Sequence, residues 1–278
     1  MKAFGASVLL SMLVTTSALA QSIEGFGKGL TDRDYPHVGT PLLKAFQFHY
    51  GVIIAPDSCG ELPAFWVQED HHLTQILIAP DFSPGKIRIG FHDKNGDDKY
   101  FYRLSHHSVS NPRIQQFTRT LDICGEQGKC TVRLDKPKGD FVFVLVGFQL
   151  SFRGTDHHID EVGILEKDGE LTVFFNDRND DDLFLWSVQF AYVPGDLLQD
   201  VGVSSGTRER RGASRTIGRG NPVIRGFKFN FEPYFTSGGD HHIGHISVCA
   251  STGRVDVLYM DKNGDDGFDW EVHWATLR

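Results

Sequence analysis

Apolar and polar residues alternate along most of the chain. The stretch GFKFNF at 226–231 places phenylalanine at every second position, and Phe268 to Trp274 alternates large apolar with polar side chains. A period of two predicts strands with one buried face, and no helical period of any length occurs. We therefore expect an all-β protein.

This pattern is written three times. Each copy has an alternating apolar stretch, the tripeptide Asp-His-His, an acidic turn and a closing ladder of mostly aromatic residues, over 44–109, 144–194 and 222–278. Each copy predicts about four antiparallel strands. Repeats that cannot bury both faces alone must stack on one another. We expect three divergent repeats in a pseudo-threefold, β-prism-like assembly, with a tandem β-sandwich-like assembly as the alternative.

The first 20 residues are typical of a signal peptide. Lys2 is followed by an apolar run from Val8 to Val14 and by the small-x-small sequence Ala18-Leu19-Ala20. We expect an exported protein, periplasmic or secreted, that starts at Gln21. No stretch reaches the roughly 18 apolar residues of a transmembrane segment.

Three segments lie outside the repeats. We interpret 21–43 as an extended lead-in and 110–143 as an insertion with a cysteine hairpin. The segment 195–221 is rich in Arg, Gly and Ser with almost no apolar residues, which predicts a flexible, protease-sensitive loop. A basic docking arm is the alternative.

The four cysteines predict two disulfides in an exported chain. Cys124 and Cys130 enclose a short polar tip, so we expect them to pair, which leaves Cys59 with Cys249. Metal binding by these thiols is the alternative. The formal net charge of −8 argues against a nucleic-acid partner.

The acidic turns have oxygen-bearing side chains at alternate positions. Such spacing is typical of Ca²⁺ loops, although no EF-hand glutamate follows at the twelfth position. The alternative is that Asp, Asn and Gly simply make good turns. The predicted calcium ligands are Asp93, Asn95, Asp97, Asp177, Asn179, Asp181, Asp261, Asn263 and Asp265.

Antiparallel connectivity brings the Asp-His-His units to the same end as the acidic turns of their own copies. We expect a ligand-binding edge there. In the alternative, one histidine of each pair bonds the acidic turn of its own copy. A zinc site on these imidazoles is less favoured, because no HExxH-type spacing supports it. The candidate ligand-binding residues are Asp70, His71, His72, Asp156, His157, His158, Asp240, His241, His242 and Trp66.

Trp66 and Phe65 form an aromatic pair in an insertion of the first copy, as on many sugar-binding surfaces, although packing on the sheet is the more common fate. The ladders of the fourth strands are expected in the core. The closing stretch 270–275, together with GFKFNFEPYF, resembles the H-type lectin domain, a small β-sandwich that binds sugars. This similarity covers two short stretches of one copy and favours glycan binding.

These features predict an exported, non-catalytic binding protein that recognises a glycan or another surface ligand with the help of calcium. One alternative is an exported hydrolase of polysaccharide or phosphate ester that uses Asp and His of one repeat. Another is a structural or adhesive repeat protein without metal. No Gly-x-Ser-x-Gly motif occurs, and the oligomeric state is left open by the sequence.

Overall fold

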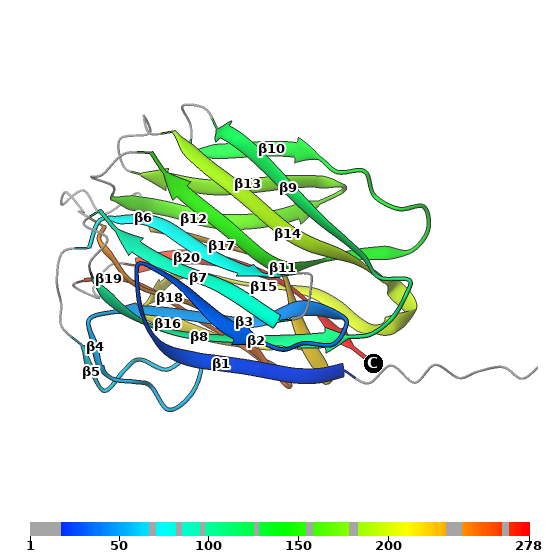
Figure 1. Ribbon diagram of the computed structural model, residues 1–278, viewed down its shortest axis with the longest axis horizontal. Helices are drawn as coiled ribbons and strands as arrows, with labels where there is room; N and C mark the ends of the chain where they lie inside the picture. Colours follow the sequence, from blue (N-terminus) through cyan, green and yellow to red (C-terminus); the bar gives the residue numbers. More distant parts are fainter. Residues whose placement is uncertain are drawn as a thin grey trace, which may run out of the picture.

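The fold is built from three six-stranded antiparallel sheets and one two-stranded hairpin. The computed structural model describes residues 18–66, 71–81, 85–94, 98–124, 128–153, 158–177, 183–231, 241–262 and 267–278. In Figure 1 the strands run roughly along the long axis of the molecule. The prediction of an all-β protein is confirmed. Among the described residues, no helix is long and apolar enough to cross a membrane.

The strands of the three large sheets follow in their spatial order. The first sheet contains β1 (Ala18–Lys28), β8 (Lys99–Val109), β3 (Thr40–Tyr50), β18 (Ile243–Ser251), β19 (Arg254–Asp261) and β16 (Gly212–Thr216). The second contains β2 (Leu30–Tyr35), β7 (Gly85–Asp93), β6 (Leu73–Pro80), β11 (Phe141–Phe152), β14 (Phe184–Pro194) and β9 (Gln115–Cys124). The third contains β10 (Lys129–Arg133), β13 (Glu170–Asp177), β12 (Ile159–Lys167), β17 (Asn221–Phe231), β20 (Gly267–Leu277) and β15 (Leu198–Arg210).

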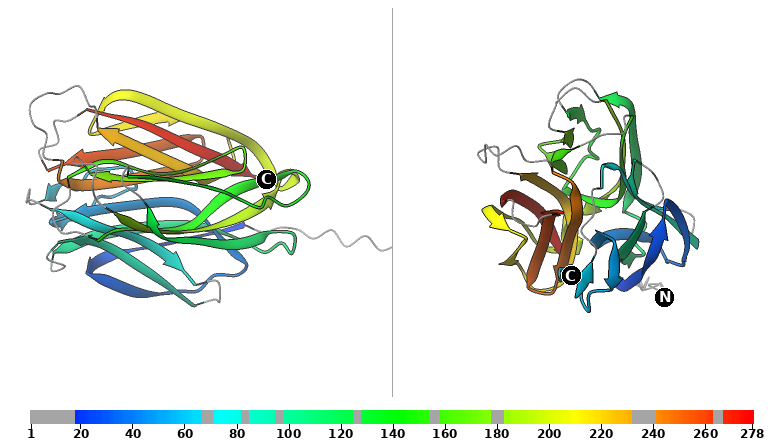
Figure 2. Two further views of the ribbon diagram at one scale, coloured as in Figure 1. Left: turned by 90° about the horizontal axis from the view of Figure 1, so that it is seen from above. Right: turned by 90° about the vertical axis from the view of Figure 1, so that its left-hand side faces the viewer.

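Each sheet joins strands from two of the sequence copies. The first strands of the copies are β3, β11 and β17, and each pairs with the fourth strand of its own copy, β8, β14 or β20. On its other side each first strand pairs with the second strand of a different copy, in the pairs β3–β18, β11–β6 and β17–β12. No copy therefore forms a sheet by itself. The views in Figure 2 show the three sheets packed against one another.

The segments outside the repeats supply the outer strands. The lead-in gives β2 and most of β1, whose first three residues belong to the expected signal peptide. The cysteine insertion gives β9 and β10, and the Arg-rich segment gives β15 and β16 after a short 3₁₀ turn at Gly195–Leu197. The prediction of a flexible loop at 195–221 was wrong. β15 pairs with β20 from Leu198 to Arg210, and most of its side chains stay exposed or half-buried. Backbone pairing at an open sheet edge needs no apolar side chains, so composition did not reveal these strands.

Aromatic side chains hold the three sheets together. Phe46, Phe148 and Phe227, one from each first strand, contact one another with ring centres 4.9–5.5 Å apart. Each first strand also stacks on the third strand of its own copy, which lies in another sheet, through Tyr50–Phe91, Phe152–Phe175 and Phe231–Tyr259 at 4.1–4.3 Å. The fourth-strand ladders are buried, as predicted.

A β-bulge interrupts each first strand at a corresponding place. The register shifts between Leu43 and Ala45, between Leu145 and Gly147, and between Ile224 and Gly226. An extra residue reverses the faces that the following side chains occupy. Residues N-terminal to the bulges, including Leu42, Val144 and Val223, accordingly pack in an apolar cluster that is separate from the main core.

The β4–β5 hairpin (Val52–Ile54 and Phe65–Trp66) lies in the insertion of the first copy. Figure 1 shows it at the end of the molecule where β6 begins. The Cys59–Cys249 disulfide ties this insertion to β18, with Cα atoms 5.8 Å apart. Cys124 pairs with Cys130, so both predicted pairings are confirmed.

In β8, the fourth strand of the first copy, His106 occupies a position that is aromatic in the other two copies. It is fully buried, and its Nε2–H donates to the carbonyl oxygen of Val146 at 3.0 Å. Its Nδ1 therefore accepts from the hydroxyl of Tyr35 at 2.7 Å. Burial lowers the pKa of His106 to about 4, and the hydrogen bond to Val146 opposes this shift. Burial also lowers the pKa of His107 to about 4 and that of His49 to about 3.

These histidines predict acid sensitivity. Because their folded-state pKa values lie below the unfolded value near 6.5, the folded state binds fewer protons, and stability falls as pH drops from about 6.5 to about 4. Each histidine is expected to cost about 1.4 kcal/mol per pH unit in that window. The measurement is the free energy of unfolding in urea as a function of pH. For the Tyr35→Phe/His106→Phe double variant, the slope of this free energy against pH should be smaller by the contribution of one histidine. An unchanged slope would contradict this account, and Tyr35→Phe alone is the control.

The two disulfides are expected to differ in their contribution to stability. Chain-entropy arguments give about 5 kcal/mol for Cys59–Cys249, which spans 190 residues, and about 2 kcal/mol for Cys124–Cys130, which spans 6. In denaturant unfolding, Cys59→Ser/Cys249→Ser should be destabilised clearly more than Cys124→Ser/Cys130→Ser. Equal losses would show that loop closure is not the dominant effect.

Candidate functional site

Three histidines from the three copies meet at one point. His72, His158 and His242 each precede the second strand of a copy by one residue, ahead of β6, β12 and β18. One ligand atom of each lies within 4.8 Å of those of the other two. The ring centres are 4.5–5.2 Å apart, and the ring planes cross at 77–84°. We call these residues the three-histidine cluster.

The ligand atoms of the cluster lie close enough together that the three imidazoles could hold a metal ion. In tetrahedral zinc sites with metal–nitrogen distances near 2.0–2.1 Å, imidazole ring centres lie roughly 5 Å apart. Rings that stacked face to face would direct their nitrogens away from a common point, whereas these rings meet edge to face. His242 is buried, and His72 and His158 are half-buried. Three imidazoles leave one tetrahedral position for water or a ligand.

In the two described pairs, His71–His72 and His241–His242, only the second histidine joins the cluster, as expected for neighbours that point to opposite sides of the backbone. His71 is buried and stacks on Tyr50 with ring centres 4.0 Å apart, and its Nδ1 lies 2.9 Å from Asp98 Oδ2. His241 stacks in the same way on Phe231 at 4.3 Å.

His71 lies beside a carboxylate of its own copy, whereas His241 lies beside a carboxylate of another copy. Asp98 belongs to the acidic turn of the same copy as His71, as one alternative predicted. The Nδ1 of His241 instead lies 2.7 Å from Oδ1 of Asp160, which belongs to the second copy. The amide of Ile159 also donates to the carbonyl oxygen of His241 at 3.1 Å. These contacts join the start of β12 to the start of β18 and thereby position two members of the cluster.

A second group of possible metal ligands lies beside His71. His71, Asp93 and Asp98 each offer a ligand atom, all within 4.8 Å of one another. Burial raises the pKa of Asp98. A hydrogen bond that protonated Asp98 donates to Asp93, and the negative charge of Asp93, raise this pKa further, while His71 lowers it. Asp177 and Asp261, which correspond to Asp93 in the other copies, are also buried.

Several predicted site residues lie outside the described residues. These are the calcium candidates Asn95, Asp97, Asn179, Asp181, Asn263 and Asp265, together with Asp70, Asp156, His157 and Asp240. Of the predicted calcium ligands, the described residues contain the first aspartate of each turn, Asp93, Asp177 and Asp261.

The predicted aromatic pair is divided between two environments. Trp66 packs on His245, with ring centres 3.8 Å apart, whereas Phe65 is 62% exposed. Trp66 therefore packs on the sheet, which is one of the two outcomes expected for it.

Sequence reasoning missed the convergence of His72, His158 and His242. A zinc site on these imidazoles was less favoured by the sequence because they have no HExxH-type spacing. The signal that was available is that the three second strands start at matching positions in the copies. No known protein family matches the chain, and no curated protein matches its sequence.

Proposed function

We propose that this protein is an exported binding protein whose three-histidine cluster holds one divalent transition-metal ion, Zn²⁺. The observation that carries this proposal is the convergence of three imidazoles at the spacing of a zinc site. Imidazole nitrogen is a preferred zinc ligand. A fourth position would receive water or a ligand carried by a partner. Two disulfides are typical of oxidising compartments and support export.

The proposal includes a pseudo-threefold relation among the copies. It is supported by the matching strand pairings, by the contact of Phe46, Phe148 and Phe227, and by the three matching bulges. A metal on the pseudo-threefold axis would receive one ligand from each copy. This favours a shared centre over a hydrolytic site built from the Asp and His of one repeat.

Calcium binding at the acidic turns is a second candidate, favoured by the closeness of Asp93, Asp98 and His71 in the first copy. A divalent cation would offset the repulsion between the two carboxylates. In this role calcium would order the turns and coordinate hydroxyl groups of a glycan.

Zinc binding is tested with neighbouring histidines as matched variants. The purified protein is expected to bind one Zn²⁺ per chain by calorimetry and metal analysis. Zinc at 100 times its dissociation constant should stabilise the protein by about 2.7 kcal/mol. His242→Gln should weaken binding at least 100-fold because it removes a ligand. His241→Gln should weaken binding much less than His242→Gln, because it removes the contact with Asp160 that positions the cluster but no metal ligand. Equal binding by wild type and His242→Gln would reject the centre.

Calcium binding is tested by thermal melting in chelator and after addition of Ca²⁺. The expected result is a rise in melting temperature of a few degrees, or about 1–2 kcal/mol. Asp93→Asn should reduce this rise while it leaves the zinc response intact. If Asp93→Asn destabilises the protein equally in chelator and in calcium, the residue has a structural role only.

A further inference from the structure

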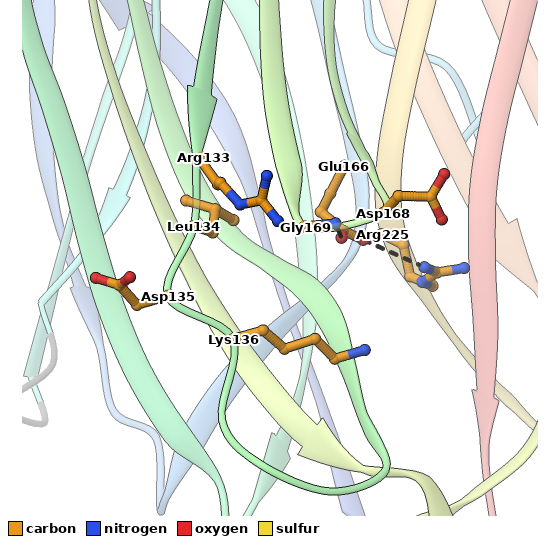
Figure 3. Close-up of a pocket in the computed structure, with 8 residues that line it drawn as sticks. All are labelled: Arg133, Leu134, Asp135, Lys136, Glu166, Asp168, Gly169 and Arg225. Carbon is orange, nitrogen blue, oxygen red and sulfur yellow. Dashed lines mark hydrogen bonds and ion pairs between the residues drawn. The ribbon is translucent and has the colours of Figure 1, made fainter.

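A cleft of about 720 Å³ lies away from the three-histidine cluster. It is bounded by the segment that leaves β10, by the turn between β12 and β13, and by the bulge of β17 (Figure 3). Its lining residues are Arg133, Leu134, Asp135, Lys136, Glu166, Asp168, Gly169 and Arg225. None is aromatic, and Leu134 is the one large apolar member.

The cations of the cleft outnumber the carboxylates that face it. In Figure 3 the side chains of Arg133 and Lys136 extend toward the side on which Glu166 and Arg225 lie, whereas the carboxylate of Asp135 points the opposite way. The carboxylate of Asp168 lies on the same side as Arg225. Asp135 forms an ion pair with Arg119 at 3.5 Å. Three cations and the carboxylates of Glu166 and Asp168 therefore face the cleft, so it has an excess of one positive charge although the chain has a net charge of −8.

Arg225 is held in place without using all of its donors. It is the extra residue of the β17 bulge, and its side chain is 16% exposed. Its Nε donates to the carbonyl oxygen of Phe143 at 3.2 Å. Its Nη2 lies 3.7 Å from Oε2 of Glu166, which is longer than a hydrogen bond. A guanidinium group has five N–H donors, so donors remain for a ligand.

Glu166 is positioned by the neighbouring turn. Its Oε1 accepts a hydrogen bond from the amide of Gly169 at 2.8 Å, and the side chain is 10% exposed. This leaves Oε2 toward Arg225 and able to accept from a ligand hydroxyl. The cleft thus combines a fixed guanidinium, a fixed acceptor and two further cations.

We propose that this cleft binds the carboxylate of an acidic sugar, a uronate. Arginine recognises a carboxylate through two parallel N–H bonds, and Arg225 and Arg133 would supply them. Lys136 adds charge, while Glu166 accepts from sugar hydroxyls. The volume falls within the range of small-ligand sites, about 300–1,000 Å³. The polar lining suits a hydroxylated ligand better than an apolar acid. This proposal does not depend on the metal proposal.

The test is titration of the full-length mature protein with glucuronate at low salt. Binding is measured by calorimetry and by changes in NMR chemical shift. We expect saturable binding that Arg133→Gln/Lys136→Gln weakens at least 10-fold. Arg225→Gln should weaken it at least as much. The control Lys138→Gln removes an exposed charge nearby, outside the cleft, and should leave binding unchanged. Arg133 and Lys136 are exposed, so the double variant is expected to fold. It therefore tests the proposal even if Arg225→Gln fails to fold.

Two further probes test the chemistry. Glucose should not bind measurably, because it lacks the carboxylate, and inorganic phosphate should bind at least 10-fold more weakly than glucuronate. Absence of glucuronate binding, equal binding by the double variant, or equal binding of glucose would overturn the proposal. Binding of phosphate as tightly as glucuronate would overturn the assignment to a sugar acid.

Discussion

Pairing between the first strand of one copy and the second strand of another is the constraint on which the structure depends. In all three cases this pairing joins two half-sheets that would otherwise have open edges. It also spreads each copy over two sheets, so that the aromatic side chains of its first and third strands stack across the space between them. No copy can complete either its hydrogen bonding or its core alone. Folding of the three copies is therefore expected to be cooperative.

The same constraint produces the three-histidine cluster. Because each second strand is aligned with a neighbouring first strand, the residues that precede β6, β12 and β18 arrive at one end of the assembly. Alternation along the backbone then separates His71 from His72 and His241 from His242. His71 and His241 each pack on an aromatic ring beside a carboxylate, and His72 and His242 enter the cluster. Adjacent residues of identical type thus occupy different environments.

The β-bulge is common to the three first strands, but its extra residue is different in each. The extra residue is Lys44 in β3, Val146 in β11 and Arg225 in β17. The Val146 carbonyl accepts from His106, whereas the Arg225 guanidinium lines the charged cleft. The backbone distortion is shared, and the side chain placed on it differs.

The sequence alone determined the strand-rich fold, the buried ladders and both disulfide pairings, because these depend on local periodicity and on cysteine number. It also marked the Asp-His-His units and the acidic turns as unusual. It did not reveal the outer strands at 195–221, because a solvated edge strand needs backbone partners rather than apolar side chains.

Only the tertiary structure decided which histidines meet. His72, His158 and His242 are 84 or more residues apart in the chain, and nothing local distinguishes them from His71 or His241. Their convergence follows from pairing between copies, which is a long-range property. The cleft around Arg225 has the same origin, since β10, the β12–β13 turn and β17 are brought together by the third sheet. Periodicity specifies which side of a strand faces the core, whereas sheet order specifies which strands become neighbours.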